Sequence, residues 1–343
     1  MKIAIIGFEG SGKTSVFETL ASSSADKAKN PSQKDERHKP RLGTVMIADD
    51  RLSRLSEVYK PKKTTFAELT FIDRPGFDIA HAKDADGLVI VIGAFMGKDP
   101  NKELRDVEAE FIVSDLSITQ NRLKKLEKEL QSTKSEAGKI ERELLKVCEK
   151  ALEEGTLLKN ASLEEGQLQV LRGFQFLTLK AELVALNKPE NELGKEPPQE
   201  FLKFLSERKT GLVELCAAIE LEIKELEEDE RPEFLKSLGI DRPAKDKLIG
   251  ASRDMLDLIT FFTVKGPEAK AWAIQNGTKA LEAAGKIHTD IKRGFIRAEV
   301  INFKDYAECN FSMQDAKKKA HLRLEGKEYV VKDGDMIDFK FNV

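Results

Sequence analysis

The chain opens with an apolar run that leads into a glycine-rich segment, Lys2-Ile3-Ala4-Ile5-Ile6-Gly7-Phe8-Glu9-Gly10-Ser11-Gly12-Lys13-Thr14. Its first half is apolar and rich in β-branched residues, which predicts a strand. The spacing of Val16, Phe17 and Leu20 after it predicts a helix. Residues 7–14 between them match G-x-x-x-x-G-K-S/T, which is typical of a loop that cradles phosphate. Strand, loop and helix therefore follow in the order that a phosphate-binding α/β domain requires.

Each residue of this loop has an expected role. The backbone N–H groups of residues 9–14 are expected to converge on an anion at the helix N-terminus, where the helix dipole also favours negative charge. Lys13 is expected to reach the β- and γ-phosphates of a nucleotide, and the Thr14 hydroxyl to ligate a magnesium ion. The predicted nucleotide contacts in the loop are Glu9, Gly10, Ser11, Gly12, Lys13, Thr14 and Ser15. A glycine-rich turn without a ligand is the alternative.

Size and composition indicate several domains and no membrane span. The 343 residues are enough for two or three domains, and 40% hydrophobic and 34% charged residues are ordinary for a soluble protein. No apolar run approaches about 18 residues, and Met1-Lys2 leads straight into the first predicted strand, so we expect neither a membrane span nor a signal peptide. A cytoplasmic location is the resulting expectation. The net charge of −3 gives no overall attraction to nucleic acid.

The three cysteines are expected to be reduced packing residues. Cys148, Cys216 and Cys309 are widely separated and have neither a C-x-x-C partner nor a histidine cluster nearby.

The first part of the chain reads as an α/β core. Strands are predicted at residues 44–47, 66–72 and 88–92, with a short helix at 51–59. The continuous apolar strand 88–92 is of the kind that is buried in a parallel sheet. Strands separated by helical stretches predict a mixed, mostly parallel sheet flanked by helices.

From about Leu104 the apolar period becomes helical. The positions that recur every seven residues are Leu116, Leu123 and Leu130, with Ile112, Thr119 and Leu126 as a companion row. A second run is expected to fold back after a break near Gly138, with its apolar face formed by Ile140, Leu144, Val147 and Ala151. This pattern predicts a helical hairpin. Its apolar residues either pack against each other inside the hairpin or form a surface for a partner. A capping box at Ser162 and Glu165 predicts a further helix before the strand at 183–186.

The last part, from about Leu258, is predicted to be a small, mostly β domain. Residues 259–264 read as a strand, and Tyr329–Val331 and residues 337–343 flank the dipeptide Asp333-Gly334. Asp-Gly between two strands favours a β-hairpin. An acidic run from Glu220 to Glu233 lies before this domain and reads as a solvated helix face, with a partner contact as the alternative.

A second motif of a nucleotide site is D-x-x-G, at Asp73-Arg74-Pro75-Gly76 after a predicted strand. The Asp73 carboxylate is expected to face the magnesium shell, and the Gly76 N–H to donate to the γ-phosphate. Asp84-Ala85-Asp86-Gly87 also matches, but it precedes a strand instead of following one. Lys13, Asp73 and Gly76 are therefore the predicted catalytic residues, and Thr14 and Asp73 the predicted metal-binding residues.

The third motif, Asn187-Lys188-Pro189-Glu190, follows the strand 183–186 and is typical of a loop that reads a nucleotide base. In the usual Asn-Lys-x-Asp form the Asp accepts two hydrogen bonds from guanine. Glu190 is one methylene longer, which weakens the preference for guanine and permits adenine. Lys188 supplies an aliphatic stem to cover the base. Backbone N–H groups of Cys216, Ala217 and Ala218 are expected at the base edge, with a plain strand-to-helix junction as the alternative.

Together these motifs resemble the YchF family, the Obg-like ATPases, a branch of the P-loop GTPases that accepts ATP. The C-terminal stretch adds Ala283-Ala284-Gly285-Lys286-Ile287-His288-Thr289-Asp290 and Tyr329-Val330-Val331-Lys332-Asp333-Gly334-Asp335. These runs resemble the family's TGS domain, a ubiquitin-like β-grasp module associated with RNA and ribosome binding. The resemblance covers essentially the whole chain. It implies a nucleotide-binding G domain at residues 1–103 and 181–257, a helical insertion at 104–180 and a TGS domain at 258–343.

The chain departs from the family pattern at three places. The family's switch I threonine precedes a Glu-Pro-Asn-Val-Gly run, and the matching stretch here, Arg37-His38-Lys39-Pro40-Arg41-Leu42-Gly43, has Arg37 in its place. The long glycine-rich switch II after Gly76 is shortened, and so is the loop after Ile92, where the family places a catalytic histidine. Phe77 agrees with the family pattern, which has an apolar residue at the position where small GTPases have a water-positioning Gln. The candidates to compensate are His81, Arg74 and Arg37, with ordinary loop residues as the alternative.

The resemblance and the departures together imply nucleotide binding with weak catalysis. Lys13, Thr14 and Asp73 are expected to hold Mg-ATP, with GTP as the alternative nucleotide and with slow or partner-stimulated hydrolysis. The implied partner is the ribosome or RNA, contacted through the TGS domain and the helical insertion by a monomer. The candidate basic surface comprises Lys286, Lys292, Arg293 and Arg297 with aromatic Phe295. The alternative is a nucleotide-binding adaptor whose TGS domain binds RNA or a protein.

Overall fold

The computed structural model describes residues 1–20, 40–95, 97–132 and 135–342, so the predicted role of Arg37 lies outside the described residues. The chain folds into two compact units. One, here called the loop unit, comprises Lys2–Thr44 and Thr70–Met255, and the other, here called the C-terminal unit, comprises Val45–Leu69 and Leu256–Val343. Residues 45–69 thus group with the C-terminal residues, whereas the predicted boundaries keep them in the G domain. The hairpin at 104–180 stays within the loop unit.

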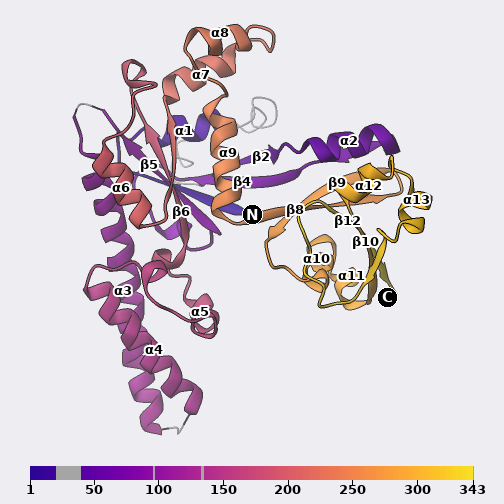
Figure 1. Cartoon of the computed structure of the whole chain (residues 1–343). Helices are drawn as coiled ribbons and strands as arrows, with labels where there is room; N and C mark the ends of the chain where they lie inside the picture. Colours follow the sequence, from indigo (N-terminus) through magenta and orange to yellow (C-terminus); the bar gives the residue numbers. More distant parts are fainter. Residues whose placement is uncertain (21–39, 96, 133–134, 343) are drawn as a thin grey trace, which may run out of the picture. The chain divides into compact units, whose positions relative to one another are not determined.

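The loop unit is built on a six-stranded sheet in the order β2-β4-β1-β5-β6-β7 (Figure 1). The strands are β1 (Lys2–Ile6), β2 (Arg41–Ile47), β4 (Ala67–Asp73), β5 (Gly87–Gly93), β6 (Ala181–Asn187) and β7 (Gly211–Leu215). β1 pairs in parallel with β4 and β5, and β6 with β5 and β7. The prediction of an α/β fold with a mixed, mostly parallel sheet is confirmed in its fold class and in these four parallel pairings. Because parallel strands end at one edge, the loops after β1, β4, β6 and β7 meet there.

Helices cover both faces of this sheet. α3 (Pro100–Ser132) and α6 (Gln199–Glu207) pack on the face that carries Ile6, Ile90 and Val184. α9 (Ala244–Met255) lies against β6 and β7, while α1 (Lys13–Leu20) contacts α7 (Ala217–Glu225). All strand residues of β5 are buried, as expected for a strand enclosed by two helical layers.

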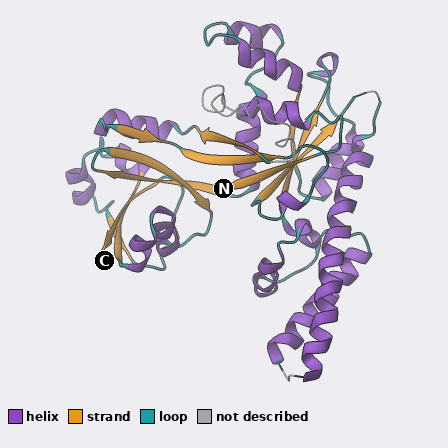
Figure 2. Ribbon diagram, turned by 180° about the vertical axis from the view of Figure 1, so that it is seen from behind, coloured by secondary structure: helices purple, strands orange, loops and turns teal. Residues whose placement is uncertain are grey.

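A helical hairpin of α3 and α4 (Glu136–Glu153) projects from the sheet, as predicted (Figure 2). Its seam is an internal core that includes Leu123, Leu126, Leu144, Leu145 and Cys148. The prediction was wrong for Ile140 and Val147, which are 65% and 52% exposed, because the face of α4 that meets α3 is rotated towards Leu145 and Cys148.

The boundaries of the hairpin helices also differ from prediction. The Ser135 side chain accepts a hydrogen bond from Gly138 N at 3.1 Å, so Gly138 lies in the first turn of α4 instead of at a break. The next helix, α5 (Glu165–Leu171), has its capping box at Glu164 and Gln167, not at Ser162 and Glu165. Buried Asp115 then ties the returning chain to α3 by accepting hydrogen bonds from Leu177 N and Thr178 N at 3.1 and 2.8 Å.

The acidic run is not uniformly solvated. Glu220 in α7 is buried and accepts hydrogen bonds from Ala244 N at 2.7 Å and Lys245 N at 3.4 Å. Burial raises the pKa of its carboxyl group. Glu220 therefore caps α9, which the residue pattern of the run did not predict. The second helix of the run, α8 (Arg231–Ser237), contains no buried residue.

The C-terminal unit contains a second sheet in the order β11-β10-β12-β8-β9-β3. Its strands are β3 (Lys63–Thr65), β8 (Leu258–Lys265), β9 (Glu268–Gln275), β10 (Phe295–Asn302), β11 (Arg323–Glu325) and β12 (Asp335–Phe341). The helices of this unit are α2 (Asp50–Tyr59), α10 (Ala280–Ile287), α11 (Thr289–Arg293), α12 (Phe303–Glu308) and α13 (Met313–Lys318). The first and last of the strands from 258 onward, β8 and β12, pair in parallel at the centre, as in the predicted β-grasp arrangement.

The predicted hairpin at Asp333-Gly334 was wrong. β12 pairs with β10 and β8, while Val330 forms an isolated bridge with Lys279. The dipeptide instead makes a turn, with Gly334 at φ +84°, in which the Asp333 carboxylate accepts a hydrogen bond from Thr260 N at 2.9 Å. A long-range partner for Asp333 thus overrides the local hairpin preference.

Residues 45–69 are an integral part of the C-terminal unit. β3 pairs in parallel with β9, and the Arg51 guanidinium bridges Asp49 and Asp333, which raises the pKa of Arg51. The Tyr59 and Tyr306 hydroxyls share a hydrogen bond. These contacts extend the sheet of the unit by one strand and add α2 to it.

The three cysteines, Cys148, Cys216 and Cys309, are buried, and none of them forms a disulfide among the described residues. Burial raises the pKa of the Cys148 thiol to about 11. No helix within the described ranges combines the length and apolar character that crossing a bilayer requires.

Candidate functional site

The glycine-rich loop joins β1 to α1 through two glycines in the left-handed backbone region. Gly10 and Gly12 have φ values of +83° and +84°, which favour glycine, and Lys13 begins the helix. Successive N–H groups in such a turn point to one side and form a concavity for an anion. The Ser11 hydroxyl is buried without a hydrogen-bond partner in the described part of the chain. The Ser11 N–H itself donates to the Phe8 carbonyl oxygen at 3.2 Å, and anion binding by the N–H groups of residues 9–14 stays a prediction.

Lys13 and the D-x-x-G turn lie together. Lys13 Nζ lies 3.1 Å from Asp73 Oδ1 and donates a hydrogen bond to the Gly76 carbonyl oxygen at 2.9 Å, and it also donates to the Arg74 carbonyl. Asp73 is fully buried and Lys13 nearly so. The three predicted catalytic residues are therefore neighbours. An anion that enters the loop competes with this turn for the Lys13 ammonium.

Arg41 is the residue that sequence reasoning missed. It begins β2, and its Nε donates to Asp73 Oδ2 at 3.0 Å, while Nη2 donates to the same oxygen. The guanidinium also lies 4.9 Å from the centre of the Phe17 ring and has Nη1 3.4 Å from Glu18 Oε1. Both Phe17 and Glu18 belong to α1. The only sequence signal is a basic residue at the start of the strand, which does not identify its partner.

A magnesium ion belongs to the predicted site, and its two predicted ligands, Thr14 and Asp73, differ in their surroundings. Thr14 is exposed in the first turn of α1, and among the described residues its hydroxyl has no hydrogen-bond partner. Asp73, in contrast, directs one oxygen to Lys13 and the other to Arg41. Oδ1 meets Lys13 as an ion pair but has no hydrogen-bond partner among the described residues, so it keeps lone pairs that a metal ion or its water could use. Metal binding by Thr14 and Asp73 stays a prediction.

Asn187 connects the loop to the strand-to-helix junction after β7. Its Nδ2 donates to the Ser11 carbonyl oxygen at 3.0 Å, and its Oδ1 accepts from Ala217 N at 3.0 Å. A Cβ atom at Gly12 would lie 2.0 Å from Asn187 Nδ2. Asn187 thus links the phosphate loop to the Cys216–Ala218 segment. Both polar atoms of its side-chain amide have hydrogen-bond partners.

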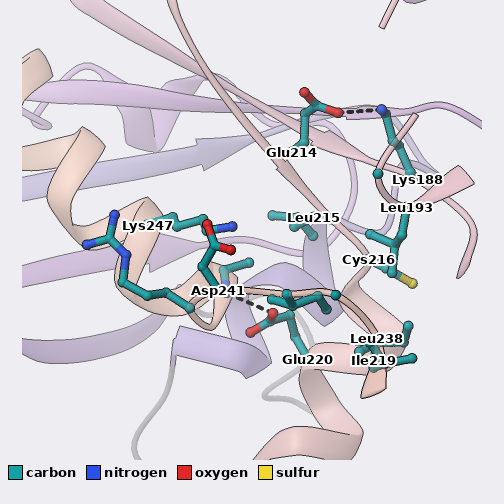
Figure 3. Close-up of a pocket in the computed structure, with 15 residues that line it drawn as sticks. Lys188, Leu193, Glu214, Leu215, Cys216, Ile219, Glu220, Leu238, Asp241 and Lys247 are labelled. Atoms are coloured by element: carbon teal, nitrogen blue, oxygen red, sulfur yellow. Dashed lines mark hydrogen bonds and ion pairs between the residues drawn. The ribbon is translucent and has the colours of Figure 1, made fainter. Parts of the chain in front are cut away.

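A cavity of about 230 Å³ lies beside the predicted base-reading motifs (Figure 3). Lys188 and Cys216 line it, together with the end of β7 and the 238–247 segment. Lys188 is 4% exposed and pairs with Glu214 while donating to the Lys195 carbonyl oxygen at 2.6 Å. Glu190 and Ala218 are exposed, and neither they nor Ala217 are among the residues that line this cavity. Base reading by Glu190 stays a prediction.

Residues after the D-x-x-G turn pack inward. The Phe77 ring stacks on Phe8 of the phosphate loop with centroids 4.4 Å apart. Arg74 pairs with Asp78 in the same turn. Both ring nitrogens of His81 are buried and lack hydrogen-bond partners in the described ranges, and burial lowers the pKa of His81. A compensating catalytic role for His81 or Arg74 stays a prediction.

A phosphate loop, a D-x-x-G turn and an Asn bridge at one edge of a parallel sheet define a P-loop nucleotide-binding fold. The solved structure of the Schizosaccharomyces pombe YchF GTPase has the same fold, with a TM-score of 0.82 at 24% identity over 99% of this chain and 97% of that one.

The sequence comparisons give the family. This chain is 32% identical over 365 residues to the "Ribosome-binding ATPase YchF" of Haemophilus ducreyi, covering 100% of this chain and 99% of that protein. It is 33% identical to the protein of the same name from Bacillus subtilis, covering 99% and 98%. Residues 258–342 match the family model YchF-GTPase_C, described as "Protein of unknown function (DUF933)". The chain belongs to the YchF family.

Two glycines of the loop offer a matched pair of substitutions. Gly10→Ala and Gly12→Ala both place a Cβ at positive φ, which costs about 1 kcal/mol. Only Gly12→Ala displaces the Asn187 amide, so we expect it to lower the free energy of unfolding by about 1–3 kcal/mol more than Gly10→Ala does. Urea unfolding measures the difference. Adding Asn187→Ala should remove this excess, and equal costs for the two glycine variants would contradict the contact.

The buried His81 ring predicts a pH dependence of stability. Below the ordinary histidine pKa of about 6.5, the unfolded chain binds a proton that folded His81 resists, because burial lowers its folded pKa. The free energy of unfolding therefore loses a contribution as pH falls from about 6.5 towards the folded pKa. His81→Gln should make this decline shallower in urea unfolding between about pH 5 and 7. Exposed His288 provides the control His288→Gln. Identical slopes in wild type and His81→Gln would contradict the prediction.

Proposed function

We propose that this chain binds a purine nucleoside triphosphate at residues 7–15 and hydrolyses it slowly. ATP is the proposed ligand and GTP the alternative. The observation that carries the proposal is the loop itself, in which Gly10 and Gly12 adopt positive φ and Lys13 stands at the start of α1 beside the D-x-x-G turn. Its backbone N–H groups and the Lys13 ammonium would hold the phosphates. The relatives named as ATPases support this function.

Slow hydrolysis follows from what surrounds the loop. Positioning and electrostatics carry most of phosphoryl-transfer catalysis, so a missing water-orienting group lowers rate more than affinity. Phe77, which follows the D-x-x-G turn, stacks on Phe8 and offers no hydrogen bond to a water molecule. Gly76 and Lys13 would act on the γ-phosphate. This combination favours a protein that holds its nucleotide and turns it over slowly.

The proposed partner is the ribosome, approached through the C-terminal unit and the α3–α4 hairpin. The relatives in H. ducreyi and B. subtilis are named ribosome-binding proteins. The predicted basic surface needs one correction, because Phe295 is 6% exposed in the core of the unit and is not free to stack on a base. Lys292 pairs with Glu282 at 2.7 Å and Arg293 with Asp290 at 3.1 Å.

Two cations of that surface are therefore the better candidates. Lys286 and Arg297 are exposed, and within the described residues neither has an ion-pair partner. An unpaired cation can neutralise a phosphate without first breaking a contact within the protein. If nucleotide turnover stays at background while ribosome binding persists, the chain acts as the alternative, a nucleotide-binding adaptor.

Lys13→Ala tests the nucleotide site. Loss of the ammonium removes charge-assisted contacts to the phosphates, so calorimetric titration should show an affinity for ATP at least about tenfold lower. Lys128→Ala, which removes an exposed lysine of α3, is the control and should bind as wild type. Thermal unfolding establishes that both variants fold. Undetectable binding of ATP and GTP to wild type would overturn the proposal, and a tenfold preference for GTP, about 1.4 kcal/mol, would change the ligand.

The ribosome proposal predicts a difference between two double variants of equal charge change. Lys286→Ala with Arg297→Ala removes unpaired cations and should weaken ribosome co-sedimentation, lowering its salt slope by about two. Lys292→Ala with Arg293→Ala removes cations that are already paired and should have a smaller effect. Equal effects, or none from the first variant, would exclude this surface as the contact.

A further inference from the structure

A cleft of about 270 Å³ lies in the C-terminal unit, whereas the proposed nucleotide site belongs to the loop unit. Strands β8, β9 and β12 form one side of the cleft, and α10 and α11 contribute Ile287 and Ile291. Apart from four charged residues, its lining is mostly apolar or aromatic. An apolar cleft with a few charged groups is the usual form of a small-molecule site.

Trp272 provides an aromatic surface in this cleft and is the only tryptophan of the chain. Its side chain is half-buried, and its indole N–H donates a hydrogen bond to Thr263 Oγ1 at 3.0 Å. The ring also stacks on Phe261 of β8, with the ring centres 6.3 Å apart. These two contacts hold the indole in place before any ligand arrives, which lowers the entropic cost of stacking a second ring on it.

Two of the charged lining residues are lysines that lie over aromatic rings. Lys270 Nζ lies 3.9 Å from the centre of the Trp272 ring and has no ion-pair partner among the described residues. Lys265 Nζ lies 5.4 Å from the centre of the Phe341 ring, and its distance to Asp338 Oδ1 is 3.9 Å. An ammonium that meets mainly a ring face keeps N–H donors for an anion.

The two acidic lining residues are bound by groups that do not line the cleft. Glu268 Oε1 accepts a hydrogen bond from Thr65 Oγ1 at 2.7 Å and lies 3.7 Å from Lys63 Nζ. The Thr65 hydrogen bond is the main cause that lowers the pKa of Glu268, and nearby lysines add to it. Asp338 Oδ2 accepts from Lys340 Nζ at 2.5 Å. The charge that the cleft can offer to a ligand is therefore positive.

We propose that this cleft binds a small aromatic carboxylate. The ring stacks on Trp272 beside Ile287 and Ile291, and the carboxylate accepts hydrogen bonds from Lys270 and Lys265. A volume of about 270 Å³ is just below the range of about 300–1,000 Å³ that drug-sized ligands need, so the ligand has one ring and a short chain. The site does not depend on the proposed nucleotide site.

Because Trp272 is the only tryptophan, its fluorescence reports directly on the cleft. Phenylpropionate, which carries a carboxylate on a short chain from one phenyl ring, is titrated into the full-length chain. We expect a saturable change in fluorescence with a dissociation constant of about 1 mM or lower, and less quenching by acrylamide because the ligand covers the indole. Phenylpropanol has the same ring without the charge and should bind about tenfold more weakly.

Three variants assign the charge preference to the cleft. Lys270→Gln removes the cation next to Trp272 and should weaken phenylpropionate binding about tenfold while leaving phenylpropanol binding unchanged. Lys265→Gln should have a smaller effect, because Lys265 already lies near Asp338. Lys317→Gln is the matched control, since Lys317 is an exposed lysine of α13 in the same unit and does not line the cleft. It should bind both ligands as wild type does.

The proposal is overturned if phenylpropionate up to about 10 mM changes neither the fluorescence of Trp272 nor its quenching. Equal affinities of wild type for phenylpropionate and phenylpropanol would exclude the carboxylate contact, as would an unchanged ratio in Lys270→Gln. AMP is titrated in parallel, and tighter binding of AMP than of phenylpropionate would overturn the ligand class. Failure of ATP to bind the loop unit would leave these measurements unaffected, so the two proposals fail separately.

Discussion

A fully buried carboxylate is the constraint on which the loop unit depends. Asp73 ends β4, where its backbone pairs with Ile5 of β1, so the sheet prevents it from moving towards solvent. An unpaired charge in such a place is costly, and cations must therefore come to it. Lys13 arrives from the start of α1 and Arg41 from the start of β2. One buried charge thus positions the phosphate loop, the D-x-x-G turn and the beginning of β2 relative to one another.

Asn187 imposes a similar constraint on the other side of the loop. Its single amide joins the Ser11 carbonyl to the Ala217 N–H, so the phosphate end and the predicted base end of the site share one side chain. Lys188, next in sequence, turns away to Glu214 at the edge of a separate cavity. Two adjacent residues of one motif therefore have different roles. Asn187 holds the phosphate loop in place, and Lys188 lines the neighbouring cavity.

Features that depend on residues near one another in the sequence could be predicted, whereas contacts between residues far apart in the sequence could not. The loop, the parallel sheet and the helical hairpin follow from short-range periodicity and from one glycine pattern, and all three are present. The partner of Arg41 lies 32 residues away, and that of Asp333 lies 73 residues away at Thr260, so neither leaves a trace in a local pattern. The charged neighbours of Glu220 predict a solvated side chain, but its carboxylate accepts a hydrogen bond from Ala244 N at the start of α9. Ile140 and Val147 were misplaced because a helical period gives the width of an apolar face but not its rotation.

Because residues 45–69 belong to the C-terminal unit, the two units cannot be separated by cutting the chain at one place. The polypeptide passes between the units at residues 44 and 45, at 69 and 70, and at 255 and 256. A gene fusion or a protease cut at one junction near 257 therefore does not yield two finished modules. Such a cut separates β9 from β3 and Tyr306 from Tyr59, and leaves a fragment whose hydrogen-bonding edge has lost its neighbour. A single cut between the units therefore always divides the C-terminal unit as well.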